Sequence, residues 1–330
     1  MNTVTAELAV SAPRRLGRFR ELRILLVVLA FGIGMEVYTI WQPGMDTEFL
    51  SGPTINTILL YLASYAIMAC GMTVLLVSGG FDLSVGSVAA LASMVAAILM
   101  KGQAHLAWPL AFLIGLATGA AVGLANGLIV ARLGINPFIT TLGTMLIARG
   151  LTYIVSGGTG RSGFPDAFHY LGAGKFLGIQ LPIVISLALV FVFDFLLRKS
   201  RFFRQNYYVG GNEQAAWLSG IAVNRIKVFN YCLSGTLAAL AGLLFSARLN
   251  AAAPNFGDGD ELKVITAVIV GGASLAGGRG TVLGAFLGCV LLAMIRPAIT
   301  FLQIQDNWEK FIIGAILIGA VLVDRIGRRK

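Results

Sequence analysis

Apolar runs of about 20 residues recur along almost the whole chain, and they constrain its fold more than any other feature. A helix rises about 1.5 Å per residue, so such a run matches the roughly 30 Å hydrocarbon layer of a bilayer. Of the 330 residues, 57% are apolar and only 12% are charged. A soluble globule of this size cannot bury that much apolar surface inside itself. The chain is therefore expected to be an all-α integral membrane protein.

We expect ten membrane-spanning helices within residues 22–323, with tails at 1–21 and 324–330. The runs that predict them are 22–40, 55–77, 84–100, 106–130, 138–155, 179–197, 228–247, 262–276, 282–295 and 307–323. The eighth and ninth runs are each about two thirds of a span long and meet at a glycine-rich segment. They are either two short spans or halves of one broken helix, which a membrane tolerates only where protein or water surrounds the break.

The positively charged residues predict the orientation of these spans. Seventeen Lys and Arg residues fall on the side that holds both tails and the loop 198–227, and seven fall on the other side. Cytoplasmic loops carry the excess of Lys and Arg in membrane proteins. Both termini and the loop 198–227 are therefore expected in the cytoplasm. The polar segment 1–20 lacks the apolar core of a cleaved signal peptide, which favours a cytoplasmic tail.

Several other classes of function are disfavoured. The net charge is +10, yet basic patches interleaved with aromatic residues are absent, so we expect no nucleic-acid partner. Cys70, Cys232 and Cys289 lie in separate apolar runs without a CxxC motif, which disfavours disulfides and a metal site. The chain has no GxxxxGK[ST] phosphate-binding loop, so it is not expected to hydrolyse ATP by itself. We expect neither a metal nor a cofactor.

Few ionisable side chains fall inside the predicted spans. Glu36 lies near the end of the first span, Asp194 near the end of the sixth, and Arg149 in the fifth. All three are expected to reach a membrane interface by extending their side chains. No span carries a series of acidic residues at its centre, which disfavours a proton- or sodium-coupled transporter.

Neutral polar side chains inside the spans are the candidates for lining a substrate pathway. These residues are Tyr61, Tyr65, Asn126, Asn136, Thr140, Thr141 and Thr144. Together they offer hydroxyl and amide groups to a neutral polar solute. Each of them could instead form a hydrogen bond to a neighbouring helix.

Glycines repeat at every fourth position in the fourth span, at Gly115, Gly119, Gly123 and Gly127. This spacing puts them on one helix face, where another backbone can approach closely. We interpret the ridge as a packing surface. It indicates a bundle of many contacting helices.

The turn before the third span has a distinctive sequence. Its residues include Gly80, Asp82, Leu83, Ser84 and Gly86. Asp82 or Ser84 could cap the following helix, because a short side-chain oxygen can accept hydrogen bonds from the amides of the first turn.

The loop 198–227 is predicted to contain a short helix outside the membrane. The residues concerned are Asn212, Glu213, Gln214, Ala215, Ala216, Trp217, Ser219 and Gly220. Asn212 is a suitable N-cap, Glu213 complements the helix dipole, and Gly220 suits the C′ position. Small residues around one Trp would fit a groove on a cytosolic partner.

Three segments together resemble the ribose/xylose/arabinose group of ATP-binding cassette (ABC) sugar-importer permeases. Residues 80–86 resemble its GxDLSVG signature, with Phe81 where Ile is more frequent. Residues 210–221 resemble its coupling helix, with Gln214 where an acid or Ala is frequent. Residues 261–281 are similar to its GGxSLxGGxGT segment. The segments occur in family order, and the resemblance covers about residues 22–323.

The resemblance implies a transport permease, not an enzyme, that carries a neutral monosaccharide such as a pentose, a hexose or a related polyol. Its implied partners are a separate cytoplasmic ABC ATPase, a sugar-binding protein, and a second copy or a sister permease. The implied location is the bacterial cytoplasmic (inner) membrane. Two alternatives remain: a branched-chain amino-acid permease of the same superfamily, and an ion-coupled secondary transporter.

The predicted orientation can be tested with single cysteines in a variant whose three native cysteines are replaced. An impermeant thiol reagent added to intact cells should label a cysteine at Ser162 and spare one at Ser219, because the reagent cannot cross the membrane. The reverse labelling pattern would contradict the orientation.

Overall fold

The computed structural model describes residues 14–42, 48–102 and 105–328 of the chain. Helices dominate this part, as the sequence predicts. Their bounds are α1 Arg14–Trp41, α2 Gly52–Val77, α3 Val85–Lys101, α4 Trp108–Arg132, α5 Pro137–Ser156, α6 Asp166–Ala173, α7 Leu181–Lys199, α8 Arg201–Gly211, α9 Glu213–Leu218, α10 Val223–Leu249, α11 Asp260–Val270, α12 Val282–Phe301 and α13 Trp308–Arg328. Residues 1–13 and 329–330 of the two predicted tails lie outside the described residues.

Four two-residue strands accompany the helices. They are β1 Arg161–Ser162, β2 Lys175–Phe176, β3 Ile179–Gln180 and β4 Ala251–Ala252. β1 pairs with β4, and β2 pairs with β3, both antiparallel. The β1–β4 pair joins two loops that are about 90 residues apart in the sequence, so it fixes them to each other at one end of the bundle.

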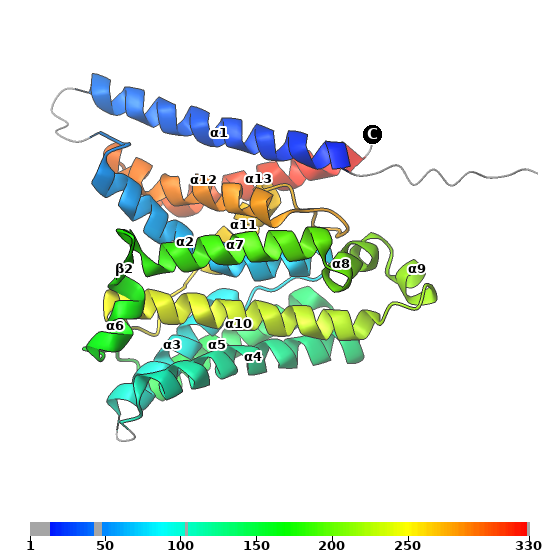
Figure 1. Cartoon of the computed structure of the whole chain (residues 1–330), viewed down its shortest axis with the longest axis horizontal. Coiled ribbons are helices and arrows are strands. Elements are labelled where there is room, and N and C mark those ends of the chain that lie inside the picture. The colour runs from blue at the N-terminus through cyan, green and yellow to red at the C-terminus, as the bar shows by residue number, and fades with distance from the viewer. Residues whose placement is uncertain (1–13, 43–47, 103–104, 329–330) are drawn as a thin grey trace, which may run out of the picture.

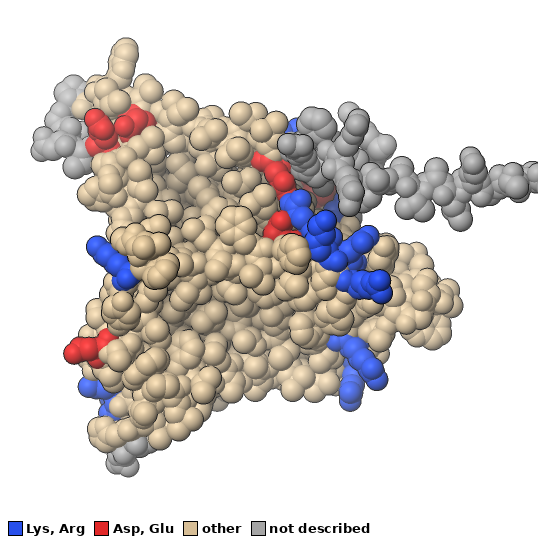
Figure 2. Space-filling model, viewed as in Figure 1, with Lys and Arg blue, Asp and Glu red and all other residues tan. Residues whose placement is uncertain are grey.

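Within the described residues, seven helices are long and apolar enough to cross a bilayer: α1 from Glu21, α2, α4, α5, α7, α10 and α12. They coincide with seven of the ten predicted spans, and α3 is a shorter apolar helix of 17 residues. The long helices lie side by side in Figure 1, with α6 at one end and α8 and α9 at the other. The face shown in Figure 2 carries its charged residues at these two ends and none across the middle. This distribution fits a helical bundle in a bilayer.

The start of α1 and the end of α13 lie at the same end of the bundle as α9, as Figure 1 shows. The Glu21 Oε1 atom of α1 accepts a hydrogen bond of 2.8 Å from Thr281, in the turn before α12. We call this end the α9 end and the opposite one the α6 end.

The eighth and ninth predicted spans form a hairpin with arms of unequal length. α11 has 11 residues, about 16 Å, and ends at Val270 because glycine-rich turns follow. The prediction that α12 is short was wrong, since this helix continues through Pro297 to Phe301 and has 20 residues. Gly284 and Gly288 of α12 lie against Gly271 and Ala267 respectively, so the two helices are antiparallel neighbours and not halves of one broken helix.

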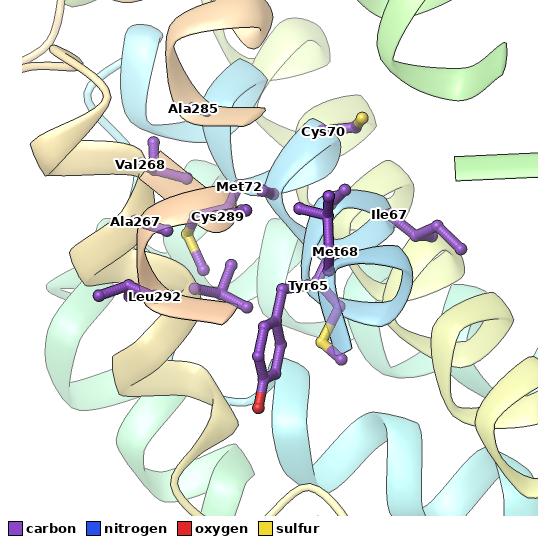
Figure 3. Packing of buried hydrophobic residues seen from close by; sticks show 14 of the residues in the cluster. Tyr65, Ile67, Met68, Cys70, Met72, Ala267, Val268, Ala285, Cys289 and Leu292 are labelled. Atoms are coloured by element: carbon purple, nitrogen blue, oxygen red, sulfur yellow. The ribbon is translucent and has the colours of Figure 1, made fainter. Parts of the chain in front are cut away.

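The core of the bundle surrounds α2. Most of its residues from Leu62 to Val77 are buried, and α7, α10, α11 and α12 all pack against it. Figure 3 shows Met68 and Met72 of α2 in one cluster with Val268 of α11 and Cys289 of α12. α2 is therefore shielded from lipid by other helices over most of its length.

The glycine ridge of α4 is a packing surface, as predicted. α10 lies directly on it, and a Cβ added at Gly119 would overlap the carbonyl oxygen of Gly235. A Cβ added at Gly123 would overlap the carbonyl oxygen of Tyr231. The two backbones therefore approach each other without intervening side chains.

We expect Gly123→Leu to destabilise the bundle by about 1–3 kcal/mol or more, because the new side chain has no space between α4 and α10. The measurement is the yield and thermal stability of monodisperse protein in detergent. Gly34→Leu is the matched control, since a Cβ at this exposed position on α1 meets no atom within 4 Å. A Gly123→Leu variant as stable as the Gly34→Leu variant would contradict this interpretation of the ridge.

Candidate functional site

The turn between α2 and α3 buries the carboxylate of Asp82. Its Oδ1 atom accepts hydrogen bonds from the backbone N–H and the hydroxyl of Ser84, at 2.8 and 2.6 Å. Its Oδ2 atom accepts one of 3.1 Å from the Ser234 hydroxyl of α10. Ser84 occupies the N-cap position of α3, but its side chain makes no capping hydrogen bond, so the predicted capping role is wrong for both residues. Asp82 instead holds the turn together and ties it to α10.

This hydrogen-bond network continues into α4 and α5. The Asn126 amide donates to the Ser84 hydroxyl at 3.1 Å, and the Thr144 hydroxyl donates to Asn126 Oδ1 at 2.6 Å. The α2–α3 turn and the helices α4, α5 and α10 are thereby linked through side chains. Buried polar groups in a bilayer require partners of this kind. The arrangement accounts for Asn126 and Thr144 as residues that connect helices.

The other predicted pathway residues of α5 have separate environments. Asn136 caps this helix, because its Oδ1 accepts a hydrogen bond of 2.8 Å from the N–H of Phe138. The Thr141 hydroxyl donates to the Pro137 carbonyl. The Thr140 hydroxyl is buried without a hydrogen-bond partner among the described residues. None of the three lines the cavity described below, beside Tyr61 and Tyr65.

The remaining residues of the signature turn shape its backbone. Gly79 has φ of +80°, and the N–H of Gly80 donates to the Leu75 carbonyl at 2.9 Å, so α2 ends in a Schellman motif. Leu83 is buried. Gly86 has no room for a Cβ, which would overlap a carbonyl oxygen of the loop before α11.

A cavity of about 200 Å³ lies between α2, α3, α10, α12 and the segment that leads into α11. Tyr61 and Tyr65 line it, so the structure brings these two predicted residues together. Ser64 and Asn255 add polar groups to the wall. The side chains of Tyr61, Ser64 and Asn255 form no hydrogen bonds with other described residues, so their polar groups are available to a solute.

Charged residues surround this cavity, and the sequence reasoning missed them. Lys263 Nζ lies 2.8 Å from Glu309 Oε1 and 3.6 Å from Asp260 Oδ1, and it donates to the Tyr65 hydroxyl at 3.3 Å. The Arg296 guanidinium lies 5.6 Å from the centre of the Tyr61 ring. The spacing of Asp260 and Lys263, three residues apart, was the available signal for an ion pair on one helix face.

The three ionisable residues predicted inside the spans are held by protein groups. Arg149 donates to the carbonyls of Pro254 and Phe256 at 2.8 and 2.7 Å, so it fixes the loop before α11 and does not extend to the membrane interface as predicted. Asp194 pairs with Arg198 at 2.6 Å. Glu36 accepts a hydrogen bond of 2.7 Å from the N–H of residue 50.

The short helix predicted in the loop 198–227 is α9, and its caps are as expected. Asn212 Oδ1 accepts a hydrogen bond of 2.9 Å from the N–H of Ala215. Gly220 has φ of +83° and ends the helix in a Schellman motif, while Ala216 packs inward against the start of α10. The Glu213 carboxylate pairs with Lys227 at 2.7 Å.

One side of α9 is open to solvent. Trp217 and the next residue, Leu218, are 66% and 71% exposed. Gln214 and Trp217 border a shallow groove on the same helix. The Ser219 hydroxyl donates a hydrogen bond of 2.8 Å to the Ala215 carbonyl. Two large exposed apolar side chains beside a groove are typical of a protein-binding surface.

α8 connects α9 to the bundle. Its Tyr207 hydroxyl donates to the Gly280 carbonyl at 2.8 Å, in the turn between α11 and α12. Burial, together with the negative charge of Asp194, raises the pKa of Tyr207 to about 12. The phenol therefore stays protonated at neutral pH and keeps its donor role.

Comparison with known proteins finds a family of permeases and several permease relatives. Residues 54–321 match the family model described as "Branched-chain amino acid transport system / permease component". The chain is 36% identical over 315 residues to the ribose import permease protein RbsC of Bacillus subtilis (strain 168), covering 94% of this chain and 93% of that protein. It is 39% identical over 284 residues to the RbsC protein of Escherichia coli (strain K12), covering 85% and 88%. It is also 38% identical over 270 residues to the L-arabinose transport system permease protein AraH of the same strain, covering 81% and 80%.

Proposed function

This chain belongs to the family of branched-chain amino acid transport system permease components, and we propose that it is the permease subunit of an ABC importer for a neutral monosaccharide. The observation that carries the proposal is its identity of 36–39% to ribose and arabinose permeases over at least 81% of its length. A transport subunit of this kind is not an enzyme. ATP hydrolysis would take place on a separate ATPase chain.

In this proposal the protein lies in the bacterial inner membrane. Its α9 end faces the cytoplasm. The excess of Lys and Arg on that side supports it. The exposed Trp217 and Leu218 of α9 are then available to the ATPase, which makes α9 the coupling helix. A sugar-binding protein would deliver its solute at the α6 end, and the permease would pair with a second copy or a sister permease.

We assign the cavity beside Tyr61 and Tyr65 to the substrate pathway. Ligand pockets for drug-sized molecules span about 300–1,000 Å³, so a cavity of about 200 Å³ suits a smaller solute. The hydroxyls of Tyr61 and Ser64 and the amide of Asn255 offer hydrogen bonds to sugar hydroxyls. The Lys263 charge is balanced by the carboxylates of Asp260 and Glu309, so this residue does not require an anionic solute.

One observation favours the alternative of a branched-chain amino acid. Both signs of charge occur at the cavity wall, in Asp260, Lys263 and Arg296, and a zwitterion carries both signs too. The two functions differ in which solutes compete for uptake, so one experiment separates them.

The transport proposal is tested in proteoliposomes that contain the permease, its ATPase and its binding protein. We expect ATP-dependent accumulation of a labelled pentose or hexose, because an uncharged sugar can form hydrogen bonds with the polar groups of the cavity wall. Unlabelled neutral sugars should compete, and leucine or glutamate in large excess should not. Leucine-competed uptake would support the amino-acid alternative, and uptake driven by an ion gradient without ATP would contradict an ABC importer.

The assignment of the cavity is tested separately with Ser64→Phe, which fills part of it. We expect at least about tenfold weaker sugar uptake, since filling a binding cavity removes space that the solute needs. Thr57→Phe, at an exposed position on the same helix, is the matched control. Normal uptake by an inserted Ser64→Phe variant would remove this cavity from the pathway.

A further inference from the structure

Three glycine-containing segments that are far apart in the sequence meet at the α9 end. They are Gly79 after α2, Gly210 in α8, and Gly277 with Gly278 between α11 and α12. We call this contact the glycine junction. It brings together segments that contain or directly adjoin the three motifs of the sequence, at residues 80–86, 210–221 and 261–281.

The contacts in the glycine junction are between backbones. The N–H of Gly278 donates to the carbonyl of Val77 at 2.8 Å. A Cβ at Gly210 would overlap that carbonyl oxygen and would lie 2.6 Å from the nitrogen of Gly278. A Cβ at Gly277 would lie 2.7 Å from the oxygen of Gly210 and 3.0 Å from the Cα of Gly79. The backbone of α8 thus packs directly between the turn after α2 and the turn before α12, with no side chain between them.

Buried side chains reinforce the same contact. The Asn230 amide of α10 donates to the Ser78 hydroxyl at 2.9 Å and to Asn206 Oδ1 of α8 at 2.7 Å. Tyr207 of α8 adds its hydrogen bond to Gly280. Side chains can absorb a displacement by changing rotamer, but backbones in direct contact cannot. A shift of α8 must therefore move both turns.

α9 is joined directly to this contact. Only Asn212 separates α8 from α9, and its side chain caps α9 while its N–H bonds to the Tyr208 carbonyl of α8. Because Asn212 is bonded to both helices, α8 and α9 have little freedom to move relative to each other. A force applied to α9 is therefore passed to α8.

Two routes lead from the glycine junction into the bundle. The turn after Gly79 contains Asp82, whose hydrogen bonds extend to α4, α5 and α10. The turn that contains Gly278 precedes α12, which carries Arg296 at the cavity wall, and follows α11, which carries Lys263 there. Through these routes the junction is connected to α4, α5, α11 and α12, in addition to α10, which α9 also contacts directly.

We propose that the glycine junction transmits movement of α9 to the walls of the cavity, with Gly210 as the positioning residue. This inference rests on the proposed function, because it needs an ATPase that moves α9. It adds to that function the contact through which the movement reaches the substrate pathway.

The test compares Gly210→Ala with Gly211→Ala in the reconstituted complex of permease, ATPase and binding protein. The readout is the amount of sugar transported per ATP hydrolysed, which a loss of folded protein alone does not change. Gly210→Ala should lower this ratio by about tenfold while ATP hydrolysis continues. Gly211→Ala should leave it unchanged, since a Cβ there meets no atom within 4 Å.

Tyr207→Phe keeps the shape of α8 and removes only the hydrogen bond to Gly280, so it decides the matter if Gly210→Ala does not fold. We expect a smaller decrease in the ratio, about threefold. If Gly210→Ala folds and transports as much sugar per ATP as the wild type, the inference is overturned. If Gly210→Ala does not fold, a wild-type ratio in Tyr207→Phe overturns it. A proportional loss of transport and hydrolysis would do the same, because it would indicate lost ATPase docking. Failure of the wild-type complex to accumulate sugar would instead contradict the proposed function.

Discussion

Direct contact between helix backbones is the interaction on which this structure depends. Apolar side chains gain little by leaving lipid for another helix, so association in a bilayer relies on close packing. Glycine supplies that packing where α4 meets α10 at Gly119 and Gly123, and where α11 meets α12 at Gly271 and Gly284. α2 meets α10 in the same way at Gly71, where a Cβ would lie 2.9 Å from the Cα of Ser234.

Buried polar groups are arranged around these contacts and not independently of them. Asp82 reaches Ser234 across the contact between the α2–α3 turn and α10, and Asn126 of α4 reaches Ser84 in the same turn. Each hydrogen bond then fixes the relative position of helices whose packing alone would allow sliding. The network therefore specifies the register of the bundle, while the glycines determine its compactness.

The sequence predicted those features that depend on local patterns. Seven spans followed from hydropathy, the α4 ridge from its spacing, and both caps of α9 from Asn212 and Gly220. The length of α12 was not predicted, because a proline usually ends or kinks a helix. No local feature of the sequence shows that α12 continues through Pro297. The cavity and the glycine junction also escaped prediction. Both bring together residues more than 50 positions apart, and a single sequence contains no record of such contacts.

The short length of α11 has a consequence for how such a bundle could change during evolution. The helix starts at Asp260, about 16 Å from its end, so irregular chain and not a helix occupies the rest of its path across the layer. The cavity is located in that part, while the contacts of Gly271 and Ala267 with α12 lie farther along the hairpin. Adding or removing one turn at the start of α11 would change the length of this helix by about 5 Å next to the cavity wall. The dimensions of this cavity could thus diverge among descendants of this chain while the packing of the helices is inherited intact.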